Sequence, residues 1–331
     1  MKFGVLSTAH FHVLEFVENM LQLGGEWVGI VNDGTPNFKA LMEKYNPPVV
    51  SSAQELVASG IELAGSFAPN QNRIDEVELC SQHGVHVMSD KPLVLNQKDL
   101  NRLDAVLSHG SIELGMMFTV RFMPSVWELK QVIDRGEIGD LVNIEIFNPH
   151  RLMPANRPEW FFRAEESGSI VVDLFTHSVD LLYWLSGRDP IVDYQTAVTK
   201  SILKDKPEFF DIASSIFRTQ GGKTGYFRVD WHIPDSYWTW GDMRIFCIGT
   251  KGYCEVRSVG DPITKQEKLI VFSPEQGAGC RTLPVINDNC VSDFVKRIRK
   301  QPCQITQEDI RYTCQTVLNM EQNMWNNNRF V

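Results

Sequence analysis

The stretch that decides the fold is residues 1–34, MKFGVLSTAHFHVLEFVENMLQLGGEWVGIVNDG. Short apolar runs at Phe3–Leu6 and Trp27–Val31 flank a segment with a helical pattern of apolar residues, an order that predicts parallel strands joined by a helix. Similar apolar runs follow at Glu62–Phe67, Val85–Met88 and Ile112–Phe118. We therefore expect residues 1–120 to form a doubly wound α/β domain, a parallel sheet covered by helices on both faces.

Capping residues mark where the intervening helices begin. Ser52 followed by Glu55 matches a capping box, and Asn70 and Asn96 suit N-cap positions.

From residue 121 to residue 331 the pattern changes to a second domain. A helix from Pro124 to Arg135, stopped by Gly136, opens it. Short alternating strands then dominate, interrupted by helices at 168–185, 287–300 and 307–325. The pattern predicts an α+β domain with a mostly antiparallel sheet and helices on one face. The expected strands are Asp140–Phe147, Val192–Lys200, Phe209–Arg218, Gly225–Ile233, Met243–Ile248, Tyr253–Arg257 and Lys268–Phe272.

Composition excludes several classes of protein. The 331 residues carry 32 Lys+Arg against 41 Asp+Glu, a net charge of −9, which argues against a nucleic-acid partner. No apolar stretch approaches the roughly 20 residues needed to cross a bilayer, and the N-terminus turns polar too early for a signal peptide. The seven cysteines contain no C-x-x-C pair, so we expect neither a metal site nor disulfides, and a cytoplasmic location.

The loop after the first strand, Ser7, Thr8, Ala9, His10 and Phe11, is the first place to look for a ligand. It lacks the G-x-G-x-x-G glycines that bring a backbone close to a dinucleotide. Small residues nevertheless remain at two of its positions, three side chains can donate hydrogen bonds, and the helix that follows favours an anion. A dinucleotide loop and a merely structural turn both stay open.

Asp33 follows the second strand, where an acidic residue can accept hydrogen bonds from an adenosine ribose. Gly34 beside it offers no positive charge for a 2′-phosphate, which favours NAD over NADP. The alternative is that Asp33 is a turn former.

Two further segments, Ala68-Pro69-Asn70 and Asp90-Lys91-Pro92, follow strands that end on the same sheet edge. Lys91 there could bind a cofactor ribose or a substrate hydroxyl while Asp90 holds its ammonium group, although most Lys-Pro pairs are solvated turns. The peptide bond before Pro92 is a candidate for the cis form, which about 5% of bonds before proline adopt.

Asp173 and His177 stand four residues apart in a strongly apolar helical segment, so they share one helix face. A histidine steadied by a carboxylate is a usable general base near neutral pH. A purely structural His–Asp hydrogen bond is the alternative.

Taken in order, these motifs resemble the glucose-fructose oxidoreductase and inositol dehydrogenase (Gfo/Idh/MocA) family, whose hallmarks are Glu-Lys-Pro and a later Gly-Gly-x-x-x-Asp-x-x-x-His. The sequence departs from that pattern in three places: the first loop has no glycine, Asp90 replaces Glu, and Ser169 replaces the second Gly. The resemblance continues through Ile138-Gly139, Trp184-Leu185-Ser186-Gly187 and Gly249-Thr250-Lys251-Gly252.

The resemblance implies a nicotinamide-binding Rossmann domain, an open-faced sheet domain, and a reaction between the two. Lys91 matches the family's catalytic lysine, Asp173 the residue that orients substrate and base, and His177 the general acid/base. Asp33 matches the ribose-binding acid and Arg121 a polar position beside the cleft. The cofactor-binding set it implies is Ser7, Thr8, Ala9, His10, Phe11, Asp33, Ala68, Pro69, Asn70, Asp90 and Lys91.

Substrate contacts are expected from Arg121, Trp160 and Arg163, beside Lys91, Asp173 and His177. Arg151 and Arg157 lie with Trp160 and Arg163 in the segment that leads into the Asp/His helix, and this set could bind a substrate carboxylate or hydroxyl, although surface arginines are common. The aromatic stretch 231–240 suits either a sugar ring or a subunit interface.

The expected function is an NAD-dependent dehydrogenase acting on the CH–OH group of a sugar, inositol or related polyol. One alternative is an enzyme that retains NAD and recycles the hydride, as epimerases and some glycosidases do. A non-catalytic sugar or nucleotide sensor is the other. Family members often associate through the second sheet, so a homodimer or homotetramer is expected.

Overall fold

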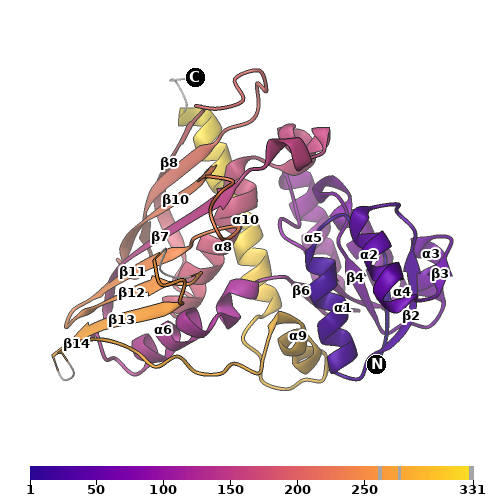
Figure 1. The fold of residues 1–331 in the computed structure, drawn as a ribbon, viewed down its shortest axis with the longest axis horizontal. Helices are drawn as coiled ribbons and strands as arrows, with labels where there is room; N and C mark the ends of the chain where they lie inside the picture. The colour runs from indigo at the N-terminus through magenta and orange to yellow at the C-terminus, as the bar shows by residue number, and fades with distance from the viewer. Residues whose placement is uncertain (260–262, 275–276, 328–331) are drawn as a thin grey trace. The chain divides into compact units, whose positions relative to one another are not determined.

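The computed structural model describes residues 1–259, 263–274 and 277–327, which form two compact units (Figure 1). The first unit contains Met1–Phe118, Glu165–Ser167 and Asp288–Gln315. The second contains Thr119–Ala164, Gly168–Asn287 and the described residues from Thr316 onward. The chain therefore passes between the units more than once, and the helix expected at 287–300 groups with the first sheet.

A six-stranded parallel sheet forms the centre of the first unit, in the order β3-β2-β1-β4-β5-β6. This confirms the predicted doubly wound sheet. The sequence pattern missed only β3, because two residues show no periodicity. The strands are β1 Lys2–Val5, β2 Glu26–Val31, β3 Val49–Val50, β4 Leu63–Ser66, β5 His86–Ser89 and β6 Leu114–Met116.

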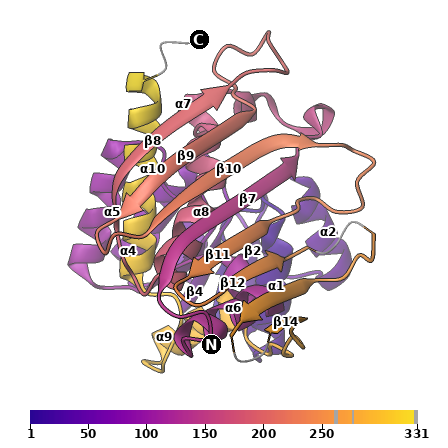
Figure 2. The same cartoon turned by 90° about the vertical axis from the view of Figure 1, so that its left-hand side faces the viewer.

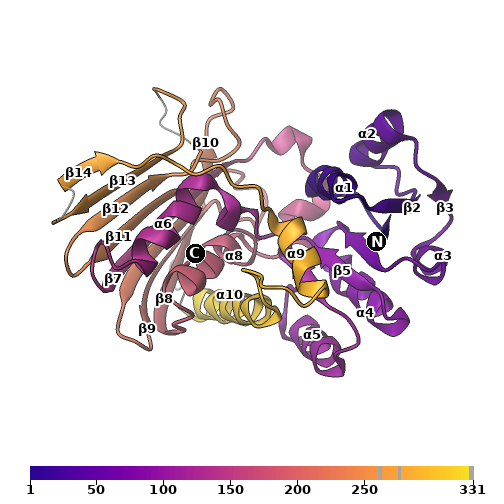
Figure 3. The ribbon, with the colours of Figure 1, turned by 90° about the horizontal axis from the view of Figure 1, so that it is seen from below.

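Helices cover both faces of this sheet (Figure 3). Helices α1, α2 and α9 lie on one face, and α3, α4 and α5 on the other. Gly65 on β4 permits this packing, since a Cβ there would lie 2.6 Å from the ring of Phe16 on α1. The helices are α1 His12–Gln22, α2 Pro36–Tyr45, α3 Ala53–Ala58, η1 Asn70–Asn72, α4 Arg73–His83, α5 Gln97–His109 and α9 Cys290–Ile298.

The predicted caps are confirmed in part. Asn96 caps α5 by accepting a hydrogen bond from the Asp99 amide, as predicted. Ser52 accepts from the Glu55 amide at 3.1 Å, but the Glu55 carboxylate turns to the amide of Ser51, so the reciprocal half of the capping box is missing.

The prediction that Asn70 is a helix N-cap is wrong. Asn70 begins the short helix η1, and its side chain instead donates to the carbonyl oxygen of Ser167 at 2.6 Å.

An eight-stranded sheet, ordered β14-β13-β12-β11-β7-β10-β9-β8, forms the second unit (Figure 2). Only the β7–β10 pair is parallel, which confirms the mostly antiparallel prediction. Gly277–Cys280 was not foreseen because small residues carry no strand pattern. The strands are β7 Leu141–Arg151, β8 Ile191–Thr199, β9 Ile212–Thr219, β10 Thr224–Ile233, β11 Arg244–Gly249, β12 Tyr253–Arg257, β13 Lys268–Ser273 and β14 Gly277–Cys280.

Helices α6, α8 and α10 pack on one face of this sheet, as predicted (Figures 2 and 3). Ile144, Ile146 and Phe227 point toward them and are fully buried. None of the described helices is long and apolar enough to cross a membrane. The remaining helices are η2 Thr119–Phe122, α6 Pro124–Asp134, η3 Pro154–Asn156, η4 Glu159–Phe162, α7 Ala164–Ser167, α8 Ile170–Leu185 and α10 Gln307–Asn327.

Candidate functional site

The first residue of the loop between β1 and α1 ties three elements together. The Ser7 hydroxyl accepts from the amide of Phe67 and donates to Glu76 on α4, each at 2.8 Å. Burial raises the pKa of Glu76 to about 7, against the effect of its hydroxyl partners. Ser7 thus anchors the loop at a position where a dinucleotide-binding loop usually has a glycine.

Thr8 binds Asp33 at the end of β2. Its amide and its hydroxyl reach the two carboxylate oxygens of Asp33, each at 2.6 Å. Oδ1 also accepts from the amide of Thr35 at 3.2 Å, whereas Oδ2 keeps a second lone pair, and the residue is exposed. Asp33 therefore both orders the loop and can accept hydrogen bonds from outside.

The start of α1 offers backbone donors. The N–H groups of Ala9 and Phe11 donate to no group among the described residues. Both lie just before the first turn of α1, where the helix dipole favours an anion. This arrangement fits a diphosphate, even without glycines in the loop.

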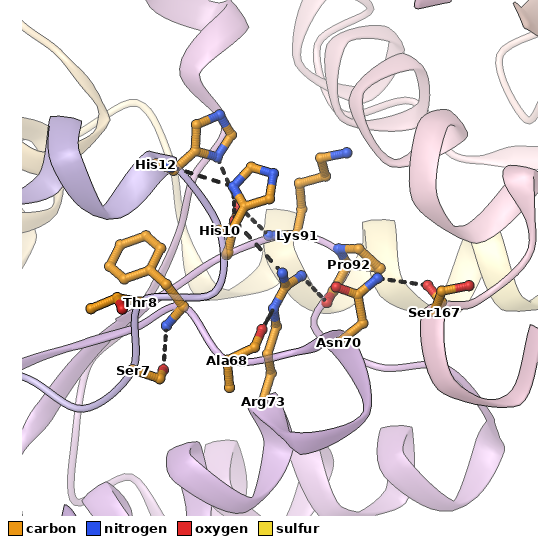
Figure 4. A network of polar contacts seen from close by, with 12 residues as sticks. Ser7, Thr8, His10, His12, Ala68, Asn70, Arg73, Lys91, Pro92 and Ser167 are labelled. Atoms are coloured by element: carbon orange, nitrogen blue, oxygen red, sulfur yellow. Dashed lines mark hydrogen bonds and ion pairs between the residues drawn. The ribbon is translucent and has the colours of Figure 1, made fainter. Parts of the chain in front are cut away.

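His10 and His12 both reach Asp90, which follows β5, and Figure 4 shows their two rings close together. The Nδ1 atom of His10 lies 2.5 Å from one Asp90 oxygen, and that of His12 lies 2.9 Å from the other. Desolvation lowers the pKa of His10 to about 4, although Asp90 opposes the shift. Burial alone would raise the pKa of Asp90, but its two histidines and Arg73 hold it well below its usual range.

Arg73 completes this network. Its buried guanidinium donates to the carbonyl oxygens of Ala68 and Pro92, at 3.0 and 2.8 Å, and lies 3.7 Å from Asp90. It thereby links the two predicted cofactor segments, Ala68-Pro69-Asn70 and Asp90-Lys91-Pro92.

The group His10, His12 and Asp90 also has three ligand-type atoms within 4.8 Å of one another, a spacing that a metal ion accepts. The guanidinium of Arg73 beside the carboxylate disfavours a divalent cation there. Hydrogen bonding and ion pairing account for the arrangement without a metal.

Lys91 follows Asp90 directly and is buried, with 8% of its surface exposed. Its amide donates to Asp90 at 2.8 Å, and its peptide bond to Pro92 is cis. Figure 4 shows its side chain extending from the end of β5 beside the ring of His10. The network around Asp90 thus fixes the backbone from which Lys91 projects.

Asp173 and His177 lie in the first two turns of α8. Ser169 is the N-cap of this helix, and its hydroxyl accepts from the amide of Val172 at 3.5 Å. His177 is buried and Asp173 is partly exposed. As predicted, the two residues stand one helical turn apart on the same face of α8.

Arg121 lies away from solvent, bound by α8. Its guanidinium makes a two-pronged ion pair with Asp180, at 3.0 and 2.5 Å, and both side chains are buried. The ring of Trp184 covers it, 5.4 Å from the guanidinium carbon. The pair joins η2 to α8, and the predicted substrate contact of Arg121 stays a prediction.

The segment before α8 contains the other predicted substrate contacts. Trp160 on η4 is half-buried and packs edge-on against Phe161, and Arg163 is exposed. Both belong to the second unit, together with Asp173 and His177.

Three residues of the network were not foreseen: His12, Arg73 and Glu76. Arg73 carries a usable signal, because a cation in the first turn of a helix opposes the helix dipole and implies a nearby acceptor. His12 shares the H-x-H spacing with His10, but an alternating pair does not reveal that both rings meet Asp90, 78 residues later.

Two family descriptions match most of the chain. Residues 3–114 match the "Oxidoreductase family, NAD-binding Rossmann fold", and residues 126–255 match the "GFO/IDH/MocA C-terminal domain".

Individual relatives are distant. The chain is 24% identical over 236 residues to the rhizopine catabolism protein MocA of Rhizobium meliloti, covering 65% of this chain and 70% of that protein. It is 27% identical over 206 residues to the myo-inositol 2-dehydrogenase of Thermotoga maritima, covering 60% and 55%. A solved protein of Erwinia carotovora atroseptica SCRI1043 superposes with a TM-score of 0.89 at 23% identity, covering 98% of both chains. That structural likeness shows the fold alone.

Proposed function

Because the chain belongs to the Gfo/Idh/MocA oxidoreductase family, we propose that it is an NAD-dependent dehydrogenase acting on the CH–OH group of a sugar, inositol or related polyol. The observation that carries the proposal is the pair Asp173 and His177 at the start of α8, together with Lys91 at the end of β5. The named activity of the myo-inositol 2-dehydrogenase relative supports the substrate class.

In the proposed reaction, Lys91, Asp173 and His177 act on one substrate hydroxyl. The Lys91 ammonium polarises the hydroxyl oxygen, and a ring nitrogen of His177 takes its proton. Asp173 stabilises the imidazolium that forms. Burial of Lys91 and His177 strengthens these interactions, because water no longer screens them.

We propose that the first unit holds NAD, which supplies the hydride acceptor when bound. The free amides of Ala9 and Phe11 would receive the diphosphate, and Asp33 the adenosine ribose. NAD is favoured over NADP because the exposed carboxylate of Asp33 would repel a 2′-phosphate and Gly34 adds no cation. The rest of the proposed cofactor-contacting set is Ser7, Thr8, His10, Ala68, Pro69, Asn70, Asp90 and Lys91.

We propose Arg121, Trp160 and Arg163 as further substrate contacts, with Arg121 also supporting α8 through Asp180. The molecule is proposed to act as a homodimer or homotetramer through the eight-stranded sheet. A cytoplasmic location is proposed because all seven cysteines are unpaired, which fits a reducing compartment.

Titration with NAD and NADP by calorimetry tests the cofactor first, after any prebound nucleotide has been measured. We expect NAD to bind more tightly than NADP. Binding of neither nucleotide, oxidised or reduced, would overturn the dehydrogenase and favour a sensor.

A sugar and polyol screen with NAD then tests the chemistry. Free NADH should accumulate, whereas an enzyme that recycles the hydride would release none. His177→Ala should lower the rate by about 100- to 10,000-fold and leave NAD affinity unchanged. His83→Ala, at the exposed end of α4, is the matched control and should retain full activity. An active His177→Ala enzyme would refute the assignment.

A further inference from the structure

Arg157, in the segment between β7 and α8, lies in an aromatic cage. Its guanidinium carbon is 4.3 Å from the ring centre of Phe161, 4.9 Å from that of Trp240 and 5.4 Å from that of Trp231. Stacked aromatic rings occupy the faces of a guanidinium and leave its N–H edge available for hydrogen bonds in the plane.

The hydrogen bonds of Arg157 leave most of that edge unused. Its Nε–H donates to the carbonyl oxygen of Leu152 at 3.1 Å. Its two terminal amino groups donate to no group among residues 1–259, 263–274 and 277–327, and within those ranges Arg157 forms no ion pair. Four N–H bonds therefore remain for a ligand.

This lack of a counter-charge distinguishes Arg157 from the buried arginines elsewhere in the chain. Arg121 is paired with Asp180, and Arg73 lies beside Asp90. Burial lowers the pKa of Arg157, and the charge of Asp173 opposes the shift. Arg157 is thus a partly buried cation within electrostatic reach of the proposed active-site helix, and a bound anion would offset the cost of its partial burial.

Backbone and side-chain hydrogen bonds hold the loop that carries Trp240, one wall of the cage. The amide of Arg151 donates to the carbonyl oxygen of Trp240 at 2.8 Å, and its guanidinium donates to that of Thr239 at 2.9 Å. A backbone bridge between His150 and Gly241 secures the same loop. Trp240 is 38% exposed, so the cage opens to solvent on its side. Such preorganisation lowers the cost of binding an anion.

We propose that Arg157 binds an anionic group of the substrate, a carboxylate or a phosphate, so that the enzyme selects acidic sugar derivatives over their neutral counterparts. Both groups match the two-pronged geometry of a guanidinium. This inference rests on the proposed function, because it assigns the anion to the substrate on which Asp173 and His177 act.

The test compares D-glucose, D-glucuronate and D-glucose 6-phosphate at constant ionic strength. kcat/KM with NAD is measured for the wild type, for Arg157→Met, which keeps an apolar stem in the cage, and for Arg157→Lys. We expect Arg157→Met to lose about 10- to 100-fold on an anionic substrate and to change less than about threefold on glucose. The kcat/KM of Arg157→Lys on the anionic substrate should lie between those of the wild type and Arg157→Met, since lysine keeps the charge but lacks the planar, two-pronged geometry of the guanidinium. The better anionic substrate identifies carboxylate or phosphate as the group recognised.

Arg135→Met is the matched control, because Arg135 lies at the exposed end of α6 and pairs with Glu128 and Glu137. It should leave all three substrates unaffected. Thermal unfolding checks that each variant is folded; should Arg157→Met fail to fold, Arg157→Lys carries the comparison.

Calorimetry of the two anionic sugars without cofactor separates this inference from the proposed function. If the protein binds the anionic sugars but no NAD, and Arg157→Met abolishes that binding, the proposed dehydrogenase is refuted and the proposed anion site is supported. Equal losses on neutral and anionic sugars, or a wild type that neither binds nor turns over either anionic probe, would overturn the role of Arg157.

Discussion

Asp90 is the residue on which the polar contacts of the first unit converge. It is fully buried, and His10, His12, Arg73 and the amide of Lys91 all reach its carboxylate. The resemblance marked Asp90 as a departure from glutamate. The histidines that meet its shorter side chain occur in the same loop that lacks glycine, so the two departures are structurally connected.

Asp90→Asn tests this connection. It keeps the shape of the side chain and removes the negative charge beside the buried guanidinium of Arg73. Breaking a buried pair costs about 3–5 kcal/mol, and we expect a loss of this order in the free energy of unfolding by urea. NAD affinity should fall with it, because His10 loses its anchor.

Asp104→Asn is the control for Asp90→Asn, since Asp104 pairs with Arg311 on the surface. Its expected cost is below about 1 kcal/mol. Equal costs for the two variants would show that the Asp90 network contributes no more than a surface pair.

Glu76 predicts a pH dependence of stability. Its pKa is about 7 in the folded protein, against an ordinary value of 4.5. Between these values the folded protein keeps a proton that the unfolded chain releases, so this carboxyl makes stability fall as pH rises from 4.5 to 7. Glu76→Gln removes the dependence and should gain up to about 3 kcal/mol on wild type between pH 4.5 and pH 8.

Urea unfolding of wild type and Glu76→Gln at pH 5, 6, 7 and 8 measures this difference. Glu43→Gln, on the exposed side of α2, should follow the wild-type curve. Parallel curves for Glu76→Gln and wild type would contradict the raised pKa.

At the scale of elements, α8 presents the proposed acid/base pair because other elements hold it. The Arg121–Asp180 pair joins η2 to the second half of α8. Arg121→Met or Asp180→Leu should each cost about 3–5 kcal/mol, since each removes one partner of a buried ion pair. The double variant should cost clearly less than the sum. Additive costs in urea unfolding would show that the two side chains act independently.

The sequence predicted elements well where periodicity was strong and poorly where tertiary contacts decide. The parallel sheet, the second sheet and α8 followed from apolar patterns, and the Gfo/Idh/MocA resemblance is confirmed over both halves of the chain. Asn70 failed as a cap because a carbonyl almost 100 residues away competes for its side chain.

The sequence could place Asp90-Lys91-Pro92 directly after a strand because the motif is continuous, and its role in the site stays a prediction. The partners of the site residues were not predictable, since Arg73 and Glu76 meet the first loop only through the fold. Local sequence also could not reveal that Arg121, predicted to touch substrate, forms an ion pair with Asp180.

At the scale of the whole molecule, we propose that the outward face of the eight-stranded sheet forms the subunit interface. None of the described elements covers it in Figure 2. Phe147 on β7 contacts Tyr226 and Phe246 on its two neighbouring strands, with ring centres 6.0 and 5.9 Å away. Ile216 is 58% exposed at the edge of a hollow of about 810 Å³ on the same face. The hollow is also lined by Glu145, Asp193 and Arg218, and such a mixture of apolar and charged side chains occurs at subunit interfaces.

Ile216→Glu should therefore convert the proposed dimer or tetramer into smaller species. A charge buried in the interface would lose its hydration without gaining a partner. The subunits can dissociate without any change in the fold of each protomer. Light scattering after size exclusion measures the mass, and NAD titration checks that the first unit is intact. Val285→Glu, at a residue 87% exposed outside the strands, is the control and should keep the wild-type mass. A wild type that is monomeric at micromolar concentration would contradict the proposed assembly. An Ile216→Glu variant of unchanged mass would place the interface elsewhere, because an interface of standard size buries about 800 Å² on each partner.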